Sequence, residues 1–166
     1  KGFFMTVKII ITGGTFDKEY DEINGKLYFN KTHMDDILSL GRSRLPVVIE
    51  PLMMIDSLDM KNSDREKILK QCTKSKEDKI VITHGTDTMS DTGKVLAGGS
   101  TNKTIVLTGA MIPYAFGTSD GLFNIGGALA FAQCLNSGVY ITMNGRYFEW
   151  DSVKKNKKTG FFETIK

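Results

Sequence analysis

Short apolar runs rich in β-branched residues recur along the chain, and longer segments with apolar residues at helical spacing lie between them. Each run has the length and composition of a strand that is buried on both faces of a parallel sheet. The runs cover residues 7–12, 47–55, 79–83, 104–108 and 139–143. Strands and helices that alternate at this spacing predict a three-layer α/β/α fold with a mostly parallel, flavodoxin- or Rossmann-like sheet.

Helix starts are visible at two places in the segments between the strands. Residues 32–35 (Thr-His-Met-Asp) and 63–66 (Ser-Asp-Arg-Glu) resemble capping boxes, in which a hydroxyl and an acid three residues later satisfy each other's free backbone amides. Apolar residues at helical spacing follow both. Two further helices are predicted after Asp87 and Ser119.

The segment 16–30 differs from the rest of the chain because it is long, polar and without a helical pattern. Leu27 and Phe29 alternate with polar neighbours, as in a small hairpin. A segment of this length inside a compact domain is usually functional, and it often forms a lid.

Glycines and hydroxyls follow the ends of several predicted strands. The first strand ends in Thr-Gly-Gly-Thr at residues 12–15, and the third is followed by residues 84–89, His-Gly-Thr-Asp-Thr-Met. The carboxyl ends of parallel strands lie along one edge of a sheet, so we expect Thr15, Thr86 and Asp87 to converge there. Two interpretations of residues 12–15 stay open: a close approach to a ligand, or a tight turn whose threonines bond nearby backbone.

A threonine hydroxyl in such a crevice is a poor nucleophile until a base or a cation helps to deprotonate it. His84 is a candidate for this role, but a single histidine at a strand end is more often structural. His33 is expected to be a surface residue. The lysine run at residues 154–158 is the other source, although such runs are usually solvated.

Composition indicates an ordinary globular protein. The chain has 166 residues, of which 40% are hydrophobic and 25% are charged, and this length suits one domain with a proper core. The net charge of +3 is mild and does not favour a nucleic-acid partner. Because Lys1 precedes Met5, we interpret residues 1–4 as an extension or a processing remnant.

Cysteine usage and hydropathy suggest the compartment. Cys72 and Cys134 lie outside any CxxC pair, which argues against a disulfide framework and against a metal site of the zinc type. No apolar run approaches the ~20 residues that cross a bilayer, and the start of the chain is too short for a signal sequence. We therefore expect a cytoplasmic protein without a membrane partner.

Three motifs in this order resemble a known family. They are TGGT at residues 12–15, HGTDTM at residues 84–89 and TGAMIPYAFGTSDGLFN at residues 108–124. Together they are similar to the amino-terminal domain of bacterial-type L-asparaginases, and the resemblance extends from about residue 7 to residue 158. TGGT alone would be a weak signal, whereas the ordered set is specific.

The resemblance implies hydrolysis of a side-chain amide through an acyl-enzyme, without a metal or an organic cofactor. By position in the motifs, Thr15 would attack the amide carbon of asparagine or a related small amide, and Thr86 would lie across the site. Lys155, which fits the family's V-x-K ending at residues 153–155, would aid Thr86. Asp87 would hold the substrate's α-amino group.

Further residues are implied as substrate contacts. Ser57 would bind the α-carboxylate, and Tyr20 would be the lid tyrosine that assists the nucleophile, with Tyr28 as the open alternative. Close contacts are also expected from Gly14, Gly85 and Ala110. Leu58 departs from the family pattern, which commonly has a polar residue beside the serine, so the pocket should be more open.

Members of this family usually carry a second, carboxyl-terminal domain, whereas the resemblance here covers one domain, assigned to residues 1–166. We therefore expect a homo-oligomer that covers the site, with residues 53–55 or 147–150 as contact segments. A second interpretation is a binding module for aspartate or asparagine with little turnover. Nucleic-acid or nucleotide binding is the weakest interpretation, because TGGT lacks both the GxGxxG spacing and the Walker lysine.

Overall fold

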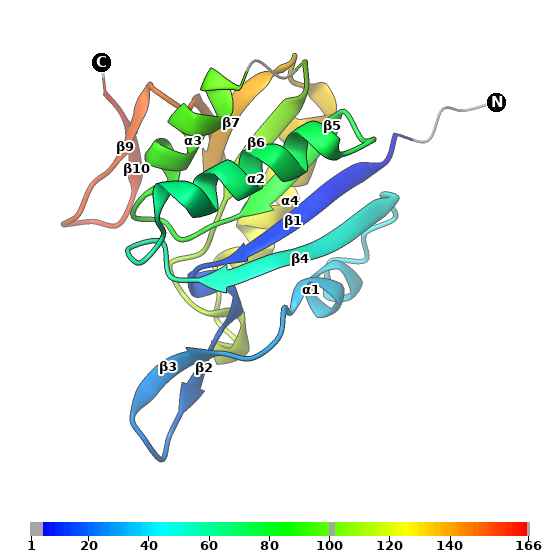
Figure 1. Cartoon of the computed structure of the whole chain (residues 1–166). Helices are drawn as coiled ribbons and strands as arrows, with labels where there is room; N and C mark the ends of the chain where they lie inside the picture. Colours follow the sequence, from blue (N-terminus) through cyan, green and yellow to red (C-terminus); the bar gives the residue numbers. More distant parts are fainter. Residues whose placement is uncertain (1–4, 100–101, 166) are drawn as a thin grey trace.

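The computed structural model describes residues 5–99 and 102–165 and is built around a six-stranded sheet with the order β4-β1-β5-β6-β7-β8 (Figure 1). The strands are β1 (Val7–Gly13), β4 (Val47–Ile55), β5 (Lys79–Thr83), β6 (Thr104–Thr108), β7 (Gly138–Met143) and β8 (Arg146–Glu149). The first five strands in this order, from β4 to β7, are parallel, and β8 runs antiparallel to β7. Each strand expected from the apolar runs is confirmed to within one residue.

The order of the parallel strands locates a crevice. Numbered along the chain, these five strands lie in the order 2-1-3-4-5, which is the flavodoxin-like arrangement. The direction of the chain across the sheet reverses between β1 and β5. In sheets of this kind, ligands bind outside the carboxyl ends of the strands at the point of reversal. The residues that follow Gly13 and Thr83 are therefore placed where a ligand is expected.

Among the described residues, four α-helices cover the two faces of the sheet, and this confirms the three layers. They are α1 (Met34–Leu40), α2 (Asn62–Lys74), α3 (Met89–Gly98) and α4 (Gly121–Cys134). Residues of α2 and α3 share one apolar core, and residues of α1 and α4 share the other; Figure 1 shows α2 and α3 in front of the sheet. Val81 and Ile82 are both fully buried and belong to opposite cores, because successive side chains of a strand point to opposite faces.

The start of α2 differs from the expected capping box. Ser63 lies inside the helix, and the residue before the first turn is Lys61. The Lys61 amide donates a hydrogen bond to the Asp64 carboxylate at 3.1 Å. The acid that satisfies a free amide is therefore three residues after Lys61 rather than three residues after Ser63, and the expected box at residues 63–66 is wrong by two positions.

In the part of the chain that the structure describes, two hairpins lie outside the main sheet. The first pairs β2 (Lys18–Asp21) with β3 (Lys26–Phe29) and projects from the body of the molecule, which confirms the expected hairpin (Figure 1). The second pairs β9 (Val153–Lys155) with β10 (Phe162–Thr164). Phe162 and Val153 are buried in the core beneath α2 and α3, so this part of the lysine run is an ordered ribbon and not a solvated tail.

Candidate active site

The carboxyl end of β1 is pressed against the ends of both neighbouring strands. Gly13 and Gly14 have φ values of 98° and 82°, which favour glycine. A Cβ atom on Gly13 would lie 2.5 Å from the backbone nitrogen of Ile55, and one on Gly14 would lie 2.7 Å from the Cα atom of Gly85. Glycine is therefore required at both positions, because the ends of the strands are in contact there.

The two threonines that flank these glycines have different surroundings. Thr12 is fully buried, and its hydroxyl donates a hydrogen bond to the Thr83 carbonyl oxygen at 2.6 Å. Thr15 is half-buried at the start of a short 3₁₀ helix (Thr15–Asp17), and within the described residues its hydroxyl makes no hydrogen bond. Thr12 thus fits the structural interpretation of the motif, whereas Thr15 leaves its hydroxyl available.

Thr15 and Thr86 follow the two glycines whose backbones meet. Because Gly14 and Gly85 are in contact, the turns that carry the two hydroxyls lie at one edge of the sheet, as the strand pattern predicts. Thr86 is only 5% exposed.

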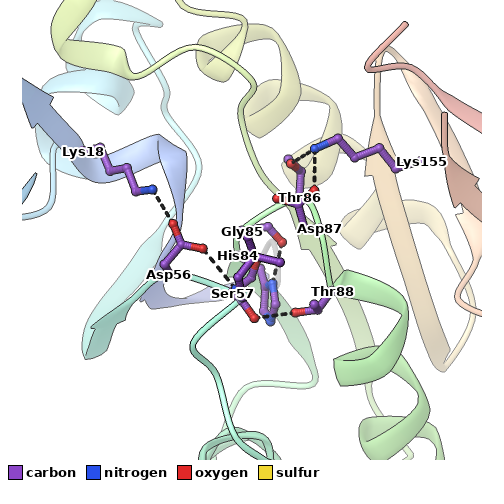
Figure 2. Close-up of polar contacts among 10 residues, drawn as sticks. Lys18, Asp56, Ser57, His84, Gly85, Thr86, Asp87, Thr88 and Lys155 are labelled. Carbon is purple, nitrogen blue, oxygen red and sulfur yellow. Dashed lines mark hydrogen bonds and ion pairs between the residues drawn. The ribbon is translucent and has the colours of Figure 1, made fainter. Parts of the chain in front are cut away.

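Lys155 brings a cation to the Thr86 hydroxyl. Its Nζ atom donates hydrogen bonds to Thr86 Oγ1 at 2.8 Å and to Asp87 Oδ1 at 2.9 Å, as Figure 2 shows. Strand β9 supplies this lysine from 69 positions away in the sequence. A cation at hydrogen-bond distance favours the deprotonated form of a hydroxyl, and the Asp87 carboxylate offsets part of the positive charge.

The turn after β4 places Ser57 beneath the same site. Its side chain is 1% exposed, and no hydrogen-bond partner for Ser57 Oγ is found in the described part of the chain. A Cβ atom on Gly85 would lie 2.5 Å from the Cβ atom of Ser57, so the two residues touch. The Thr88 hydroxyl donates to the Ser57 carbonyl oxygen at 2.9 Å and holds the turn (Figure 2). A buried hydroxyl without a partner is costly, which makes Ser57 a candidate for ligand contact.

An ion pair ties the projecting hairpin to this turn, and the sequence interpretation missed it. Lys18 at the start of β2 binds the carboxylate of Asp56, the residue before Ser57 (Figure 2). The hydrogen bond from Lys18 lowers the pKa of Asp56. The other Asp56 oxygen accepts the Leu58 amide at 3.0 Å. The only signal in the sequence was an acid next to the serine.

The two candidate lid tyrosines lie on opposite faces of the β2–β3 hairpin. Tyr28 pairs with Glu19 across the strands, and its hydroxyl donates to the Glu19 carboxylate at 3.0 Å. Tyr20 is two residues from Lys18, so both side chains project from the same face. Tyr20 is 52% exposed and makes no hydrogen bond within the described residues. The face that carries Tyr20 is the one from which Lys18 reaches Asp56.

His84 has a structural environment, in agreement with the interpretation from the sequence. Its side chain is fully buried, with Nδ1 2.7 Å from the Gly85 carbonyl oxygen and Nε2 2.7 Å from Thr92 Oγ1. A carbonyl oxygen can only accept, so Nδ1 carries the proton and Nε2 accepts from the threonine. Burial lowers the pKa of His84 to about 4, and the ring is therefore neutral near pH 7.

His33 is not the surface residue that we expected. It is 9% exposed, and its ring centroid lies 5.5 Å from that of Tyr114. Its Nε2 atom is 3.2 Å from the Glu19 carboxylate, although the angle does not make a hydrogen bond. The reason is that Glu19 of the β2–β3 hairpin and Tyr114 of a short 3₁₀ helix (Tyr114–Phe116) both lie over a position that looks exposed in the sequence.

The motif at residues 119–124 positions the turn after β6. The Asp120 carboxylate accepts the amides of Met111 and Ile112 at 3.0 Å, and Asn124 Nδ2 donates to the Gly109 carbonyl oxygen at 2.9 Å. Ala110, an expected substrate contact, lies in this turn with a fully buried side chain. The motif therefore fixes the backbone at one wall of the crevice.

Comparison with known proteins decides the family. The model of the domain described as "Asparaginase, N-terminal" matches residues 6–164. The chain belongs to the asparaginase family. It is 30% identical over 165 residues to L-asparaginase 2 of Escherichia coli, and this match covers 92% of this chain and 47% of the relative.

Solved structures agree with this membership. The thermostable L-asparaginase from Thermococcus kodakarensis superposes with a TM-score of 0.85 at 29% identity, over 97% of this chain and 51% of that chain. L-asparaginase I from Vibrio cholerae gives a TM-score of 0.83 at 25% identity, over 96% and 51% of the two chains. The chain thus spans about half the length of the asparaginases that it matches.

Across residues 5–99 and 102–165, no three His, Cys, Asp or Glu side chains gather in a way that could hold a metal ion. Within those ranges, no helix combines the length and apolarity needed to span a membrane. Cys72 is buried and Cys134 is exposed, and both are free thiols.

Proposed function

We propose that this chain is an asparaginase-like amidohydrolase that releases ammonia from the side-chain amide of asparagine or a related small amide. The observation that supports this most directly is the position of Lys155, whose ammonium group is bonded to Thr86 and to Asp87. Membership of the asparaginase family supports the same reaction class. No metal or organic cofactor is needed for this chemistry.

In the proposed reaction, Thr15 is the nucleophile. Its hydroxyl oxygen forms a bond to the amide carbon, and its proton passes to the leaving nitrogen, so that the C–N bond breaks and ammonia departs. Water then attacks the resulting ester, which yields the carboxylic acid and restores the Thr15 hydroxyl. Thr86, with Lys155 bonded to its oxygen, relays the protons across the site.

The substrate contacts follow from the same arrangement. Asp87 binds the α-amino group. Its side chain is 40% exposed, and its ion pair with Lys155 holds the carboxylate at the site. Ser57 donates its unpaired hydroxyl to the α-carboxylate. Tyr20 is the lid tyrosine rather than Tyr28, because the Tyr28 hydroxyl is already bonded to Glu19 on the other face of the hairpin. Gly14, Gly85 and Ala110 contribute the close backbone walls of the pocket.

The experiment is an assay of ammonia release from asparagine, glutamine and simple amides. We expect release by the wild type and a loss of more than about a hundredfold in Thr15→Ala, as for removal of a nucleophile. Thr73→Ala, at an exposed threonine of α2, is the matched control and should retain full activity. Equal ammonia release by Thr15→Ala and the wild type would remove Thr15 from the mechanism.

Calorimetry distinguishes the hydrolase from the alternative, a binding module. Tight binding of aspartate or asparagine without ammonia release would favour a sensor of acidic amino acids.

We also propose that the chain self-associates, which light scattering would measure. Residues 53–55 pack against the two cores, and Phe148 is buried in one of them, so neither segment expected from the sequence offers a wholly free apolar surface. A cytoplasmic location remains part of the proposal.

A further inference from the structure

A cavity of about 570 Å³ opens directly from the candidate active site. Asp87 and Lys155, which belong to that site, line this cavity. The rest of the lining comes from Leu58, Met111 and residues 157–160, which include Lys157 and Lys158. A ligand that binds at Asp87 can therefore extend into this cavity without leaving the protein surface.

The cavity has an excess of positive charge. The Lys155 ammonium lies 2.9 Å from the Asp87 carboxylate, so these two charges offset each other. Within residues 5–99 and 102–165, Lys157 and Lys158 form neither an ion pair nor a side-chain hydrogen bond with another residue. Two uncompensated cations beside a concave surface attract an anion.

The backbone that carries these lysines is fixed by Asn156. Its side-chain oxygen accepts the amides of Lys158 at 2.9 Å and Thr159 at 3.3 Å. Its side-chain nitrogen donates to the Glu163 carboxylate at 2.8 Å, across the β9–β10 hairpin. The turn is therefore held by hydrogen bonds to both strands, and the backbone of Lys157 and Lys158 has a defined position.

The same turn is closed against the loop after β6. Gly160 has a φ of 76°, and a Cβ atom there would lie 3.1 Å from the Met111 side chain. Met111 is itself held through its amide by the Asp120 carboxylate. The cavity is thus bounded by two braced segments that meet at Gly160 and Met111.

We propose that this cavity is a subsite for the second residue of an asparaginyl dipeptide, with a preference for an acidic second residue. The proposal rests on the proposed function, in which Asp87 holds the α-amino group and Ser57 faces the α-carboxyl end. Leu58 directly follows Ser57, so a residue joined to that carboxyl end lies against Leu58 and Met111 and reaches the two lysines. The Ser57 hydroxyl can donate to a peptide carbonyl as well as to a carboxylate.

The dipeptide class also accounts for the substitution at position 58. A polar residue beside the serine would bind the zwitterionic end of a free amino acid, and Leu58, which is 71% exposed, cannot do so. An apolar side chain instead packs against the chain of a longer substrate. An Asn-Glu or Asn-Asp dipeptide then presents two carboxylates to two lysines.

The test compares kcat/KM for hydrolysis of the asparagine amide in Asn-Glu and in Asn-Gln, whose second side chain is neutral. We expect the wild type to prefer Asn-Glu by about tenfold, the scale of one charge-assisted contact, and this ratio should fall towards one at high salt. The ratio should also fall to about one in the double variant Lys157→Ala/Lys158→Ala. Lys154→Ala is the matched control, because Lys154 projects from the opposite side of β9 to Lys155 and should leave the ratio unchanged.

A binding measurement separates failure of the subsite from failure of the proposed function. Calorimetry with the product dipeptides Asp-Glu and Asp-Gln needs no turnover. Tighter binding of Asp-Glu that is lost in the double lysine variant supports the subsite even if no amide is hydrolysed. Equal affinities for the two dipeptides, or a preference that survives the loss of both lysines, would overturn it.

Discussion

Gly14 and Gly85 touch through their backbones at the point where the strand order reverses, and a Cβ atom on Gly14 would lie 2.7 Å from the Cα atom of Gly85. We expect Gly14→Ala to destabilise the protein by more than about 2 kcal/mol, because the strand ends must separate and the φ of 82° is unfavourable for alanine. Urea unfolding followed by circular dichroism measures this.

Gly126→Ala is the control for that substitution. Gly126 lies in the middle of α4, and a Cβ atom there meets no described atom within 4 Å. Alanine should stabilise the helix by up to about 1 kcal/mol. Opposite signs for the two substitutions are expected, and a neutral Gly14→Ala would contradict the close approach of the strand ends.

Lys155 is expected to be essential for turnover and of little importance for folding. Lys155→Met removes the cation from the Thr86 hydroxyl while it keeps most of the side chain's apolar length. We expect kcat/KM for ammonia release to fall by more than about a hundredfold, with a change in unfolding free energy below about 1 kcal/mol. Lys154→Met should leave both quantities unchanged. Full activity in Lys155→Met would exclude its role beside Thr86.

The ion pair of Lys18 with Asp56 should couple the hairpin to the turn that carries Ser57. A double-mutant cycle of Lys18→Met and Asp56→Asn is expected to give a coupling of about 1 kcal/mol in unfolding free energy, since the side chains are 17% and 30% exposed. The single variants should also raise KM for asparagine, because the turn that carries Ser57 loses a support.

An ion pair with an exposed lysine serves as the reference for this cycle. Lys67 lies 2.9 Å from Asp64, but its side chain is 64% exposed. Its coupling should be no more than about 0.5 kcal/mol. If both cycles give the same coupling, the Lys18 pair has no special part in holding the hairpin.

His84 should make the protein less stable in acid. Its pKa is about 4 in the folded state against 6.5 ordinarily, so between these values the unfolded chain binds more protons, and stability falls as the pH drops. The loss amounts to about 3 kcal/mol between pH 7 and pH 4. Well below pH 4 the histidine is protonated in both states and adds no further loss.

The contribution of His84 is isolated by the variant His84→Gln. Burial raises the pKa of Asp17, so this carboxyl works in the opposite direction and stabilises the fold as the pH falls. The difference in unfolding free energy between wild type and variant cancels such contributions and should shrink by about 3 kcal/mol from pH 7 to pH 4. A difference that is constant over this range would show that the ring is not held neutral.

The sheet and the meeting of its strand ends could be predicted because they depend on local patterns. A run such as residues 79–83 carries enough buried apolar surface to define a strand, and the parallel order then places the following glycines and hydroxyls at one edge. The role of Lys155 could not be found this way. Within a run of lysines nothing local distinguishes it, and only the resemblance to a family selected it.

Features that depend on distant pairing were missed or mistaken. The ion pair of Lys18 with Asp56 joins positions 38 apart, and no periodicity reports such a contact. His33 looks exposed beside a helix start, yet the β2–β3 hairpin and Tyr114 fold over it. Ser63 matches a capping pattern, but the amide that needs a partner belongs to Lys61.

The origin of Lys155 in a small separate ribbon has a consequence for assembly of the site. The five parallel strands and the Thr86 turn are complete by residue 143, but the cation arrives only when β9 pairs with β10 and Phe162 inserts into the core. In the proposed reaction, amide cleavage therefore depends on the pairing of β9 with β10 as well as on the main sheet. If the β9–β10 ribbon loosened, the Thr86 hydroxyl would lose its hydrogen bond from Lys155 while the rest of the domain stays intact.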